Sequence, residues 1–244
     1  MENDSLGNRM KWYERRYTEQ CVLPMIPVIA RIDGKSFHTF TKKFRRPYDE
    51  RLSNLMQDTT MYLVSATGAR CGYTQSDEIS LVWLTEDPKS EVFFKGKLFK
   101  LISIVSSMAT AYFNTRLPNF IPEQKELAVF DSRVWEVPLY DEAANYLIWR
   151  EMDATRNSIS MAAQSLFAQR ELHKKNVSEM QDMMWKKGVN WNDYPAFFKR
   201  GTYVRRRVVE TPYTPEDVAK LPPKHSYHKN PDLKVSRLVI EKEN

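Results

Sequence analysis

Val28-Ile29-Ala30-Arg31-Ile32 is a short run of β-branched and apolar residues that stops at Asp33-Gly34, a pattern typical of a buried strand followed by a turn. A second apolar run begins after Asp77-Glu78 and reaches Leu84. Between the two runs, apolar residues recur at helical spacing over 51–65, so a helix can return the chain and let the strands pair. We therefore expect Asp33 and Asp77 to lie side by side at one edge of a sheet.

The rest of the chain repeats the same two patterns. Helical spacing predicts further helices over 4–19, 97–115 and 141–173. Alternating or β-branched runs predict further strands over 69–73, 129–137, 203–209 and 234–240. Long helices interleaved with short strands favour an α+β fold, with an antiparallel sheet, helices packed on one face and additional C-terminal strands and loops.

Two helical stripes bear on what the fold buries. In the segment 141–173 the expected inward-facing residues are Ile148, Met152, Ile159, Ala163 and Leu166. The stripe from Leu101 to Tyr112 has two explanations, burial in the core or an interface between subunits.

Composition excludes several classes of protein. Among the 244 residues there are only two cysteines, too few for a disulfide framework or a four-cysteine zinc site, and we expect reduced thiols in a cytoplasmic protein. The N-terminus lacks the pattern of a signal peptide, and the longest uncharged run is too short to cross a membrane. The net charge of +6 permits a polyanionic partner without requiring one.

The two acidic positions suggest a cation site. Neighbouring carboxylates cannot both ionise in a low-dielectric environment unless a cation lies between them, and hard oxygen ligands suit Mg²⁺. Gly34 has no Cβ, so its carbonyl can approach an ion or a phosphate closely. The alternative is that Asp33-Gly34 is only a turn and that Asp77 is only a loop residue.

Six segments resemble, in the same order, motifs of the tRNA(His) guanylyltransferase superfamily. The match as a whole covers roughly residues 5–205. The segments are Arg31-Ile32-Asp33-Gly34-Lys35-Ser36-Phe37-His38, Arg46-Pro47-Tyr48-Asp49, Gln75-Ser76-Asp77-Glu78-Ile79-Ser80, Phe130-Asp131-Ser132-Arg133, Tyr146-Leu147-Ile148-Trp149-Arg150 and Lys199-Arg200-Gly201. Six ordered motifs are far more specific than a single short pattern.

This resemblance implies a fold like the palm of nucleotide polymerases. Residues 1–140 would form the palm-like catalytic core, and residues 141–244 a helical and C-terminal segment of the same compact domain. The resemblance further implies an enzyme that adds nucleotides to tRNA 5′ ends in the 3′-to-5′ direction, with GTP and ATP as substrates and commonly as a homotetramer. Two Mg²⁺ ions would be held by Asp33, Asp77 and the Gly34 carbonyl.

The resemblance also implies nucleotide-binding residues. They are Lys35, Ser36, Phe37, His38, Arg46 and Ser76. Arg46 stands where many members have lysine, which keeps the charge but changes its geometry. Tyr48 stands where many have asparagine, and a lone histidine such as His38 is usually structural.

One departure from the family bears on the substrate. The eukaryotic enzymes carry a His-Ile-Asn-Asn-Leu-Tyr-Asn segment where this chain has residues 153–158, and only Asn157 matches it. The variant segment resembles the bacterial and phage guanylyltransferase-like branch, which is associated with template-dependent repair of tRNA 5′ ends.

Basic residues near the C-terminal strand are candidates for RNA binding, together with Asn157. They are Lys199, Arg200, Arg205 and Arg207, and alternation along a strand places Arg205 and Arg207 on one face. The alternative is an ordinary solvated, charged strand. The pair Phe197-Phe198 is expected in the core.

The sequence therefore favours template-dependent 5′-end repair of tRNA. A tRNA(His) guanylyltransferase that adds a single G is the first alternative. The others are a palm-like module that binds nucleotide or RNA without turnover, and a nucleotide cyclase of related architecture.

Overall fold

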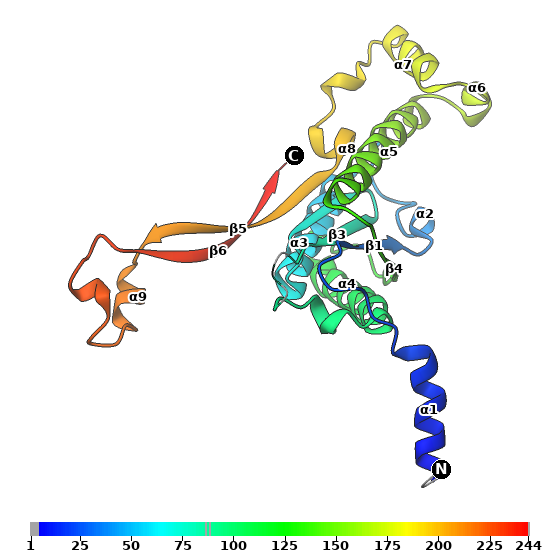
Figure 1. The fold of residues 1–244 in the computed structure, drawn as a ribbon. Helices are drawn as coiled ribbons and strands as arrows, with labels where there is room; N and C mark the ends of the chain where they lie inside the picture. Colours follow the sequence, from blue (N-terminus) through cyan, green and yellow to red (C-terminus); the bar gives the residue numbers. More distant parts are fainter. Residues whose placement is uncertain (1–4, 86, 88, 244) are drawn as a thin grey trace.

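A computed structural model describes residues 5–85, 87 and 89–243, and its centre is one six-stranded sheet (Figure 1). The strand order is β4-β1-β3-β2-β5-β6, and every neighbouring pair is antiparallel. The strands are β1 (Val28–Gly34), β2 (Cys71–Gln75), β3 (Glu78–Trp83), β4 (Phe130–Glu136), β5 (Thr202–Pro212) and β6 (Lys234–Glu243).

The described helices differ widely in length. The long ones are α1 (Leu6–Thr18), α3 (Glu50–Thr67), α4 (Leu98–Phe120), α5 (Tyr140–Leu166) and α7 (Val177–Lys186). The short ones are α2 (Phe37–Phe40), α6 (Gln169–Leu172), α8 (Ala196–Arg200) and α9 (Pro215–Ala219). Local chemistry sets the bounds of α3, because the Asp49 side chain caps its first turn and Gly68, with a φ of 69°, ends it.

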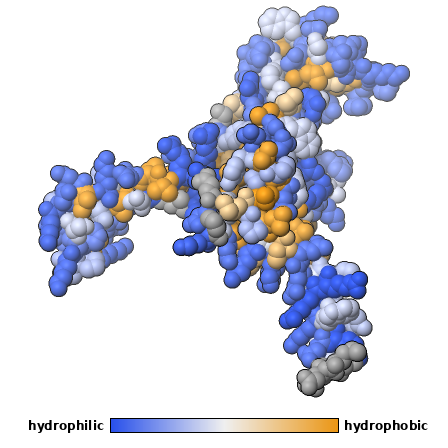
Figure 2. Space-filling model, in the orientation of Figure 1, coloured by the Kyte–Doolittle hydropathy of each residue, from blue (hydrophilic) through white to orange (hydrophobic). Residues whose placement is uncertain are grey.

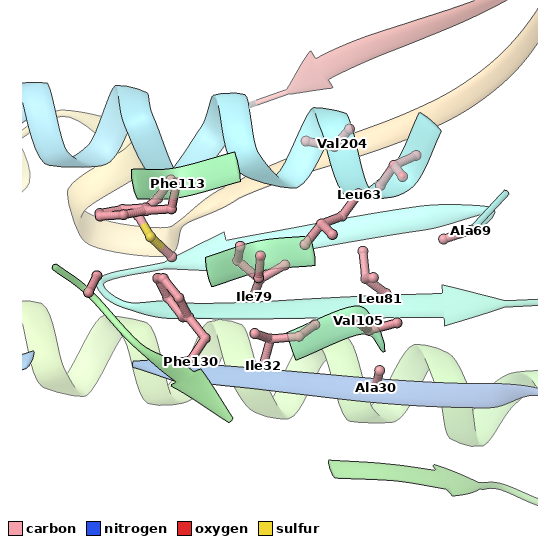
Figure 3. Close-up of a cluster of buried hydrophobic side chains, with 14 of the residues drawn as sticks. Ala30, Ile32, Leu63, Ala69, Ile79, Leu81, Val105, Phe113, Phe130 and Val204 are labelled. Carbon is pink, nitrogen blue, oxygen red and sulfur yellow. The ribbon is translucent and has the colours of Figure 1, made fainter. Parts of the chain in front are cut away.

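The main core lies between one face of the sheet and the helices α3 and α4. Ile32 of β1 and Ile79 and Leu81 of β3 are fully buried and point towards Val105 and Phe113 of α4 (Figure 3). These strand residues alternate with residues of the opposite face, as the pleat requires. The α+β class and the antiparallel sheet with packed helices are thus confirmed.

The helix α5 covers the other face of the sheet. Ile29 and Val82 pack against Ala143 and Tyr146 of this helix, and the Tyr146 hydroxyl lies 2.9 Å from Ser80 Oγ. The helices were predicted on one face of the sheet, so this second helical layer differs from the prediction. The site described below lies under α5.

The inward stripe predicted for α5 is wrong in its first half. Ile148 and Met152 are 55 % and 59 % exposed, whereas Tyr146, Arg150 and Ala154 are buried. Hydrophobic periodicity missed this face because two of its members are polar and are satisfied by partners on the sheet. Ile159 and Ala163 are buried as expected.

The stripe from Leu101 to Tyr112 is explained by the core. Leu101, Val105 and Ala109 are fully buried within the described part of the subunit. By contrast, α1 contains no buried residue and projects from the body (Figure 1).

The C-terminal strands are longer than predicted. β5 and β6 pair over ten positions and form an arm that extends away from the body, with α9 near its tip (Figure 1). Across the described residues, no helix combines the length and hydropathy needed to cross a membrane.

Candidate active site

The two predicted acidic positions meet at the end of the β1–β3 pair. Asp33 is the register partner of Glu78, and the amide of Gly34 donates a 3.2 Å hydrogen bond to the carbonyl of Asp77. Asp77 sits in the two-residue turn between β2 and β3. Both aspartates line one open pocket of about 360 Å³, together with Ser76 and Asn157. The structure therefore brings together four of the predicted site residues.

Neither aspartate has a basic partner among the described residues. The only side-chain hydrogen bond to Asp77 comes from the hydroxyl of Ser76, at 3.1 Å, and no described side chain donates to Asp33. Burial raises the pKa of Asp77 and the nearby Asp33 carboxylate raises it further, while the Ser76 hydrogen bond lowers it. A cation beside the pair would favour the charged forms of both carboxylates.

A third carboxylate at this edge is neutralised by the protein. Glu78 is 7 % exposed and accepts two 2.6 Å hydrogen bonds from Arg150 of α5. Arg150 also lines the pocket. No role was predicted for Glu78 or Arg150. The signal in the sequence was an arginine at an inward-facing position of an amphipathic helix.

The donor set fits a hard cation such as Mg²⁺. Among the described residues there is no cluster of three or more His, Cys, Asp or Glu side chains placed to hold a metal ion. Two unpaired carboxylates at one strand end would therefore need a backbone oxygen and substrate phosphates to complete a coordination shell, which is how Mg²⁺ is usually bound.

Gly34 is required for a reason that the sequence did not reveal. A Cβ at this position would lie 2.2 Å from Cδ2 of Phe37, so the aromatic ring occupies the space of the missing side chain. The ring is buried against Phe40, Phe113 and Phe130. The Phe37 ring therefore approaches Gly34 closely and occupies the space that a side chain would need.

The predicted nucleotide loop has an anchored centre and an exposed surface. Lys35, Ser36 and His38 are exposed, whereas the buried ring of Phe37 leaves only its backbone available to a ligand. The amide of Lys35 donates to the carbonyl of Val129 at 2.8 Å. Within the described residues, the amides of Ser36, Phe37 and His38 donate no backbone hydrogen bond.

A second pocket, of about 100 Å³, adjoins the acidic one. Arg46 lines it, and Ser76 and Asn157 line both pockets. One wall is aromatic, because Tyr48 packs on Phe197 and Phe198 at centroid distances of 5.3 and 4.8 Å. The prediction that Phe197 and Phe198 are core residues is wrong in part, since both are half-buried at this pocket.

The basic residues predicted to bind RNA all have intramolecular partners. Lys199 donates to the carbonyl of Asn192, and Arg200 lies 3.6 Å from Glu151. Arg205 and Arg207 are exposed on one face of β5, as alternation predicted, and pair with Glu243 and Glu241. Their role in binding RNA stays a prediction.

Comparison with known proteins gives consistent matches. The family model described as tRNAHis guanylyltransferase matches residues 7–138. An uncharacterized protein of Acanthamoeba polyphaga mimivirus is 33 % identical over 233 residues, which cover 86 % of this chain and 80 % of that protein. The tRNA(His) guanylyltransferase of Saccharomyces cerevisiae is 28 % identical over 222 residues, 83 % of this chain and 92 % of the yeast protein.

Two solved bacterial structures are also similar. A bacterial tRNA(His) guanylyltransferase-like protein in complex with ATP has a TM-score of 0.78 and 42 % identity, with 83 % of this chain and 87 % of that chain covered. A bacterial guanylyltransferase-like protein in complex with GTP has a TM-score of 0.72 and 34 % identity, with 98 % and 91 % covered.

The contact between Gly34 and Phe37 predicts a stability effect. Gly34→Ala should lower the free energy of unfolding by about 1–3 kcal/mol, because the new methyl group overlaps a packed ring. Urea unfolding would measure the change. Gly7→Ala is the control, since a Cβ on that exposed residue meets no atom within 4 Å. Equal unfolding midpoints for wild type and Gly34→Ala would contradict this explanation.

Proposed function

This chain belongs to the tRNA(His) guanylyltransferase family of nucleotidyltransferases that act on tRNA, and from that premise we propose that it repairs tRNA 5′ ends by template-dependent 3′-to-5′ nucleotide addition. The observation that carries the proposal is the pair of aspartates, Asp33 and Asp77, that line one pocket with no basic partner among the described residues. A purely structural turn would not need two unpaired carboxylates in one partly buried place.

The chain's own residues would share the work as follows. Asp33, Asp77 and the carbonyl of Gly34 would hold two Mg²⁺ ions, which would activate the attacking hydroxyl and offset charge on the phosphates. The exposed loop of Lys35, Ser36 and His38, with the free amide of Phe37, would bind triphosphate oxygens. Arg46 and Ser76 would contact the nucleotide from the second pocket.

Two nucleotidyl transfers are needed. In the first, an oxygen of the RNA 5′-monophosphate attacks the α-phosphorus of ATP or GTP, and pyrophosphate leaves. In the second, the 3′-hydroxyl of an incoming nucleoside triphosphate attacks the activated 5′-phosphorus, and the nucleoside monophosphate leaves. Both steps place anionic oxygens at the site, which is consistent with a cation beside the paired carboxylates.

Two observations favour repair over addition of a single G. The segment 153–158 lacks the family's eukaryotic pattern except at Asn157. The similar bacterial guanylyltransferase-like structure in complex with ATP shares 42 % identity with this chain, whereas the yeast tRNA(His) guanylyltransferase shares 28 %. Addition of a single G to tRNA(His) is the second candidate, and it is favoured by the names of the curated relatives.

We further propose the organisation of the protein. Residues 1–140 would be the palm-like catalytic core and residues 141–244 a helical and C-terminal part of the same domain. A cytoplasmic location is consistent with the two free cysteines, Cys21 and Cys71.

A homotetramer is supported by α1. A solitary 13-residue helix is marginal in water, yet α1 exposes Leu6, Met10, Tyr13 and Tyr17 along one stripe. In the space-filling view α1 stands clear of the body, on which hydrophobic residues also gather at the surface (Figure 2). A second copy of the chain would cover such a stripe.

The metal role predicts a selective loss of activity. Asp77→Ala should abolish nucleotide incorporation, by roughly 1,000-fold or more, because one of the two carboxylate ligands of the cations is gone. Binding of tRNA, measured by filter binding, should change little. Asp87→Ala is the matched control, because Asp87 lies beyond the opposite end of β3. Full activity of Asp77→Ala would remove the metal role.

The repair activity predicts a broad choice of tRNA. Transcripts of several tRNA identities that lack the first 5′ nucleotide should each gain the nucleotide that pairs with the template strand. Incorporation would be read by primer extension with one labelled nucleotide at a time. Extension of tRNA(His) alone, and with G alone, would support the second candidate instead.

If α1 holds the oligomer together, charged substitutions on only one face of this helix should disrupt assembly. Met10→Glu with Tyr13→Glu should convert tetramers to smaller species in sedimentation velocity, because charge is placed on the apolar stripe. Lys11→Glu with Arg15→Glu changes the opposite face and should leave the assembly intact. Loss of tetramers in both variants, or in neither, would argue against docking by the stripe.

A further inference from the structure

The pair formed by Glu78 and Arg150 lies directly beside the two unpaired aspartates. Glu78 follows Asp77 in the chain and faces Asp33 across the β1–β3 ladder. Its carboxylate is held by both Nε and Nη2 of Arg150, each at 2.6 Å. All four side chains line the same pocket.

Arg150 is itself held from two further directions. Its Nη2 donates to Asp153 at 3.1 Å, and its guanidinium lies 4.6 Å from the ring centroid of Trp149. Arg156 donates to the other oxygen of Asp153 at 2.9 Å. Arg150 is only 5 % exposed, so these neighbours, and not solvent, determine the orientation of its guanidinium.

This arrangement sorts three carboxylates into two classes. Without Arg150, Glu78 would be a third buried acid at this edge, with Arg31 as the remaining basic group that lowers its pKa and with no hydrogen-bonded basic partner among the described residues. A buried carboxylate with no partner is costly, and it would compete for any cation that the pair attracts. Because Arg150 binds both carboxylate oxygens of Glu78, Asp33 and Asp77 are the carboxylates of the three that stay available to a cation.

The contact between Arg150 and Glu78 also joins β3 to α5, which forms one wall of the pocket. Arg150 lies on α5, and Asn157, Ser160 and Gln164 line the pocket from later turns of that helix. A helix is rigid over this distance, so the position of Arg150 against Glu78 sets the distance from these residues to the turn that carries Asp77.

We propose that Arg150 is the positioning residue of this site: it withdraws Glu78 from the cation and fixes α5, with its pocket-lining residues, against the acidic strand edge. The proposal rests on the proposed function, since it assigns the remaining two carboxylates to a metal pair. It assigns no contact between Arg150 and the reacting atoms.

The withdrawal of Glu78 from the cation can be tested by equilibrium binding of Mn²⁺ to the tRNA-free protein, followed by electron paramagnetic resonance. Arg150→Met should tighten Mn²⁺ binding at least about 3-fold, because the freed Glu78 joins the acidic edge. Arg150→Met with Glu78→Gln should return Mn²⁺ affinity to that of wild type, and the neutral pair keeps the interior free of an uncompensated charge. Glu78→Gln alone leaves the Arg150 charge unpaired beside the two aspartates, so it should weaken Mn²⁺ binding, but by less than Asp77→Ala does.

Steady-state incorporation tests the geometric part. Arg150→Lys keeps the charge but cannot form the two-pronged contact, so kcat should fall about 100-fold through misplacement while Mn²⁺ affinity stays near that of wild type. Arg116→Met is the matched control. Arg116 also pairs with a carboxylate, Asp58, but this pair lies on α4 and α3, on the face of the sheet opposite to α5. This variant should retain full activity and metal affinity.

The possible failures are distinguishable. If Asp77→Ala binds Mn²⁺ and incorporates nucleotide like wild type, the proposed function is wrong. If Asp77→Ala loses both while the Arg150 variants match wild type, only the positioning role is wrong. If Glu78→Gln weakens Mn²⁺ binding as much as Asp77→Ala does, Glu78 is a ligand and Arg150 does not withdraw it.

Discussion

The register between β1 and β3 is the constraint on which the site depends. Ile32 and Ile79 are paired and face the core under α3 and α4, so their neighbours Asp33 and Glu78 must face α5. A shift of either strand by one residue would bring an acid into the apolar core and an isoleucine to the pocket. Burial of apolar side chains thus also determines where the carboxylates lie.

Charge at the strand edge is divided by the helix on the other face. Arg150 of α5 neutralises Glu78, which is buried under the helix. Asp33 and Asp77 remain at the open end of the sheet, where phosphates and solvent can reach them. The loop that follows is tied to the same place, because the Phe37 ring fills the space beside Gly34. The site therefore combines a preorganised acidic edge with an anchored loop.

Much of this could be predicted from the sequence, and the failures have a physical pattern. The convergence of Asp33 and Asp77 followed from strand ends joined by a helix, which depends only on hydrophobic periodicity and turn residues. The buried face of α5 was missed because Tyr146 and Arg150 are polar. Their hydrogen-bond partners, Ser80 and Glu78, lie on β3 and cannot be predicted from the sequence of the helix. The clash between a Cβ at Gly34 and the Phe37 ring was not predicted, since the position of that ring cannot be read from the local sequence, and the role of the Gly34 carbonyl toward a cation stays a prediction. The long arm of β5 and β6 was underestimated because exposed, charged strands carry little alternation.

The basic residues show why net charge is a weak guide to an RNA surface. Arg205 and Arg207 have glutamates of β6 beside them, so the positive charge of β5 is locally balanced. Exposed ion pairs of this kind contribute only about 0–1 kcal/mol, so a phosphate can replace a glutamate at small cost. Position then matters more than charge: Thr202 pairs with Thr74 near the acidic edge, whereas Arg205 pairs with Cys71 at the far end of β2. Contacts from Lys199 and Arg200 would therefore bear on the reacting end of an RNA, and contacts from Arg205 and Arg207 on a part more distant from it.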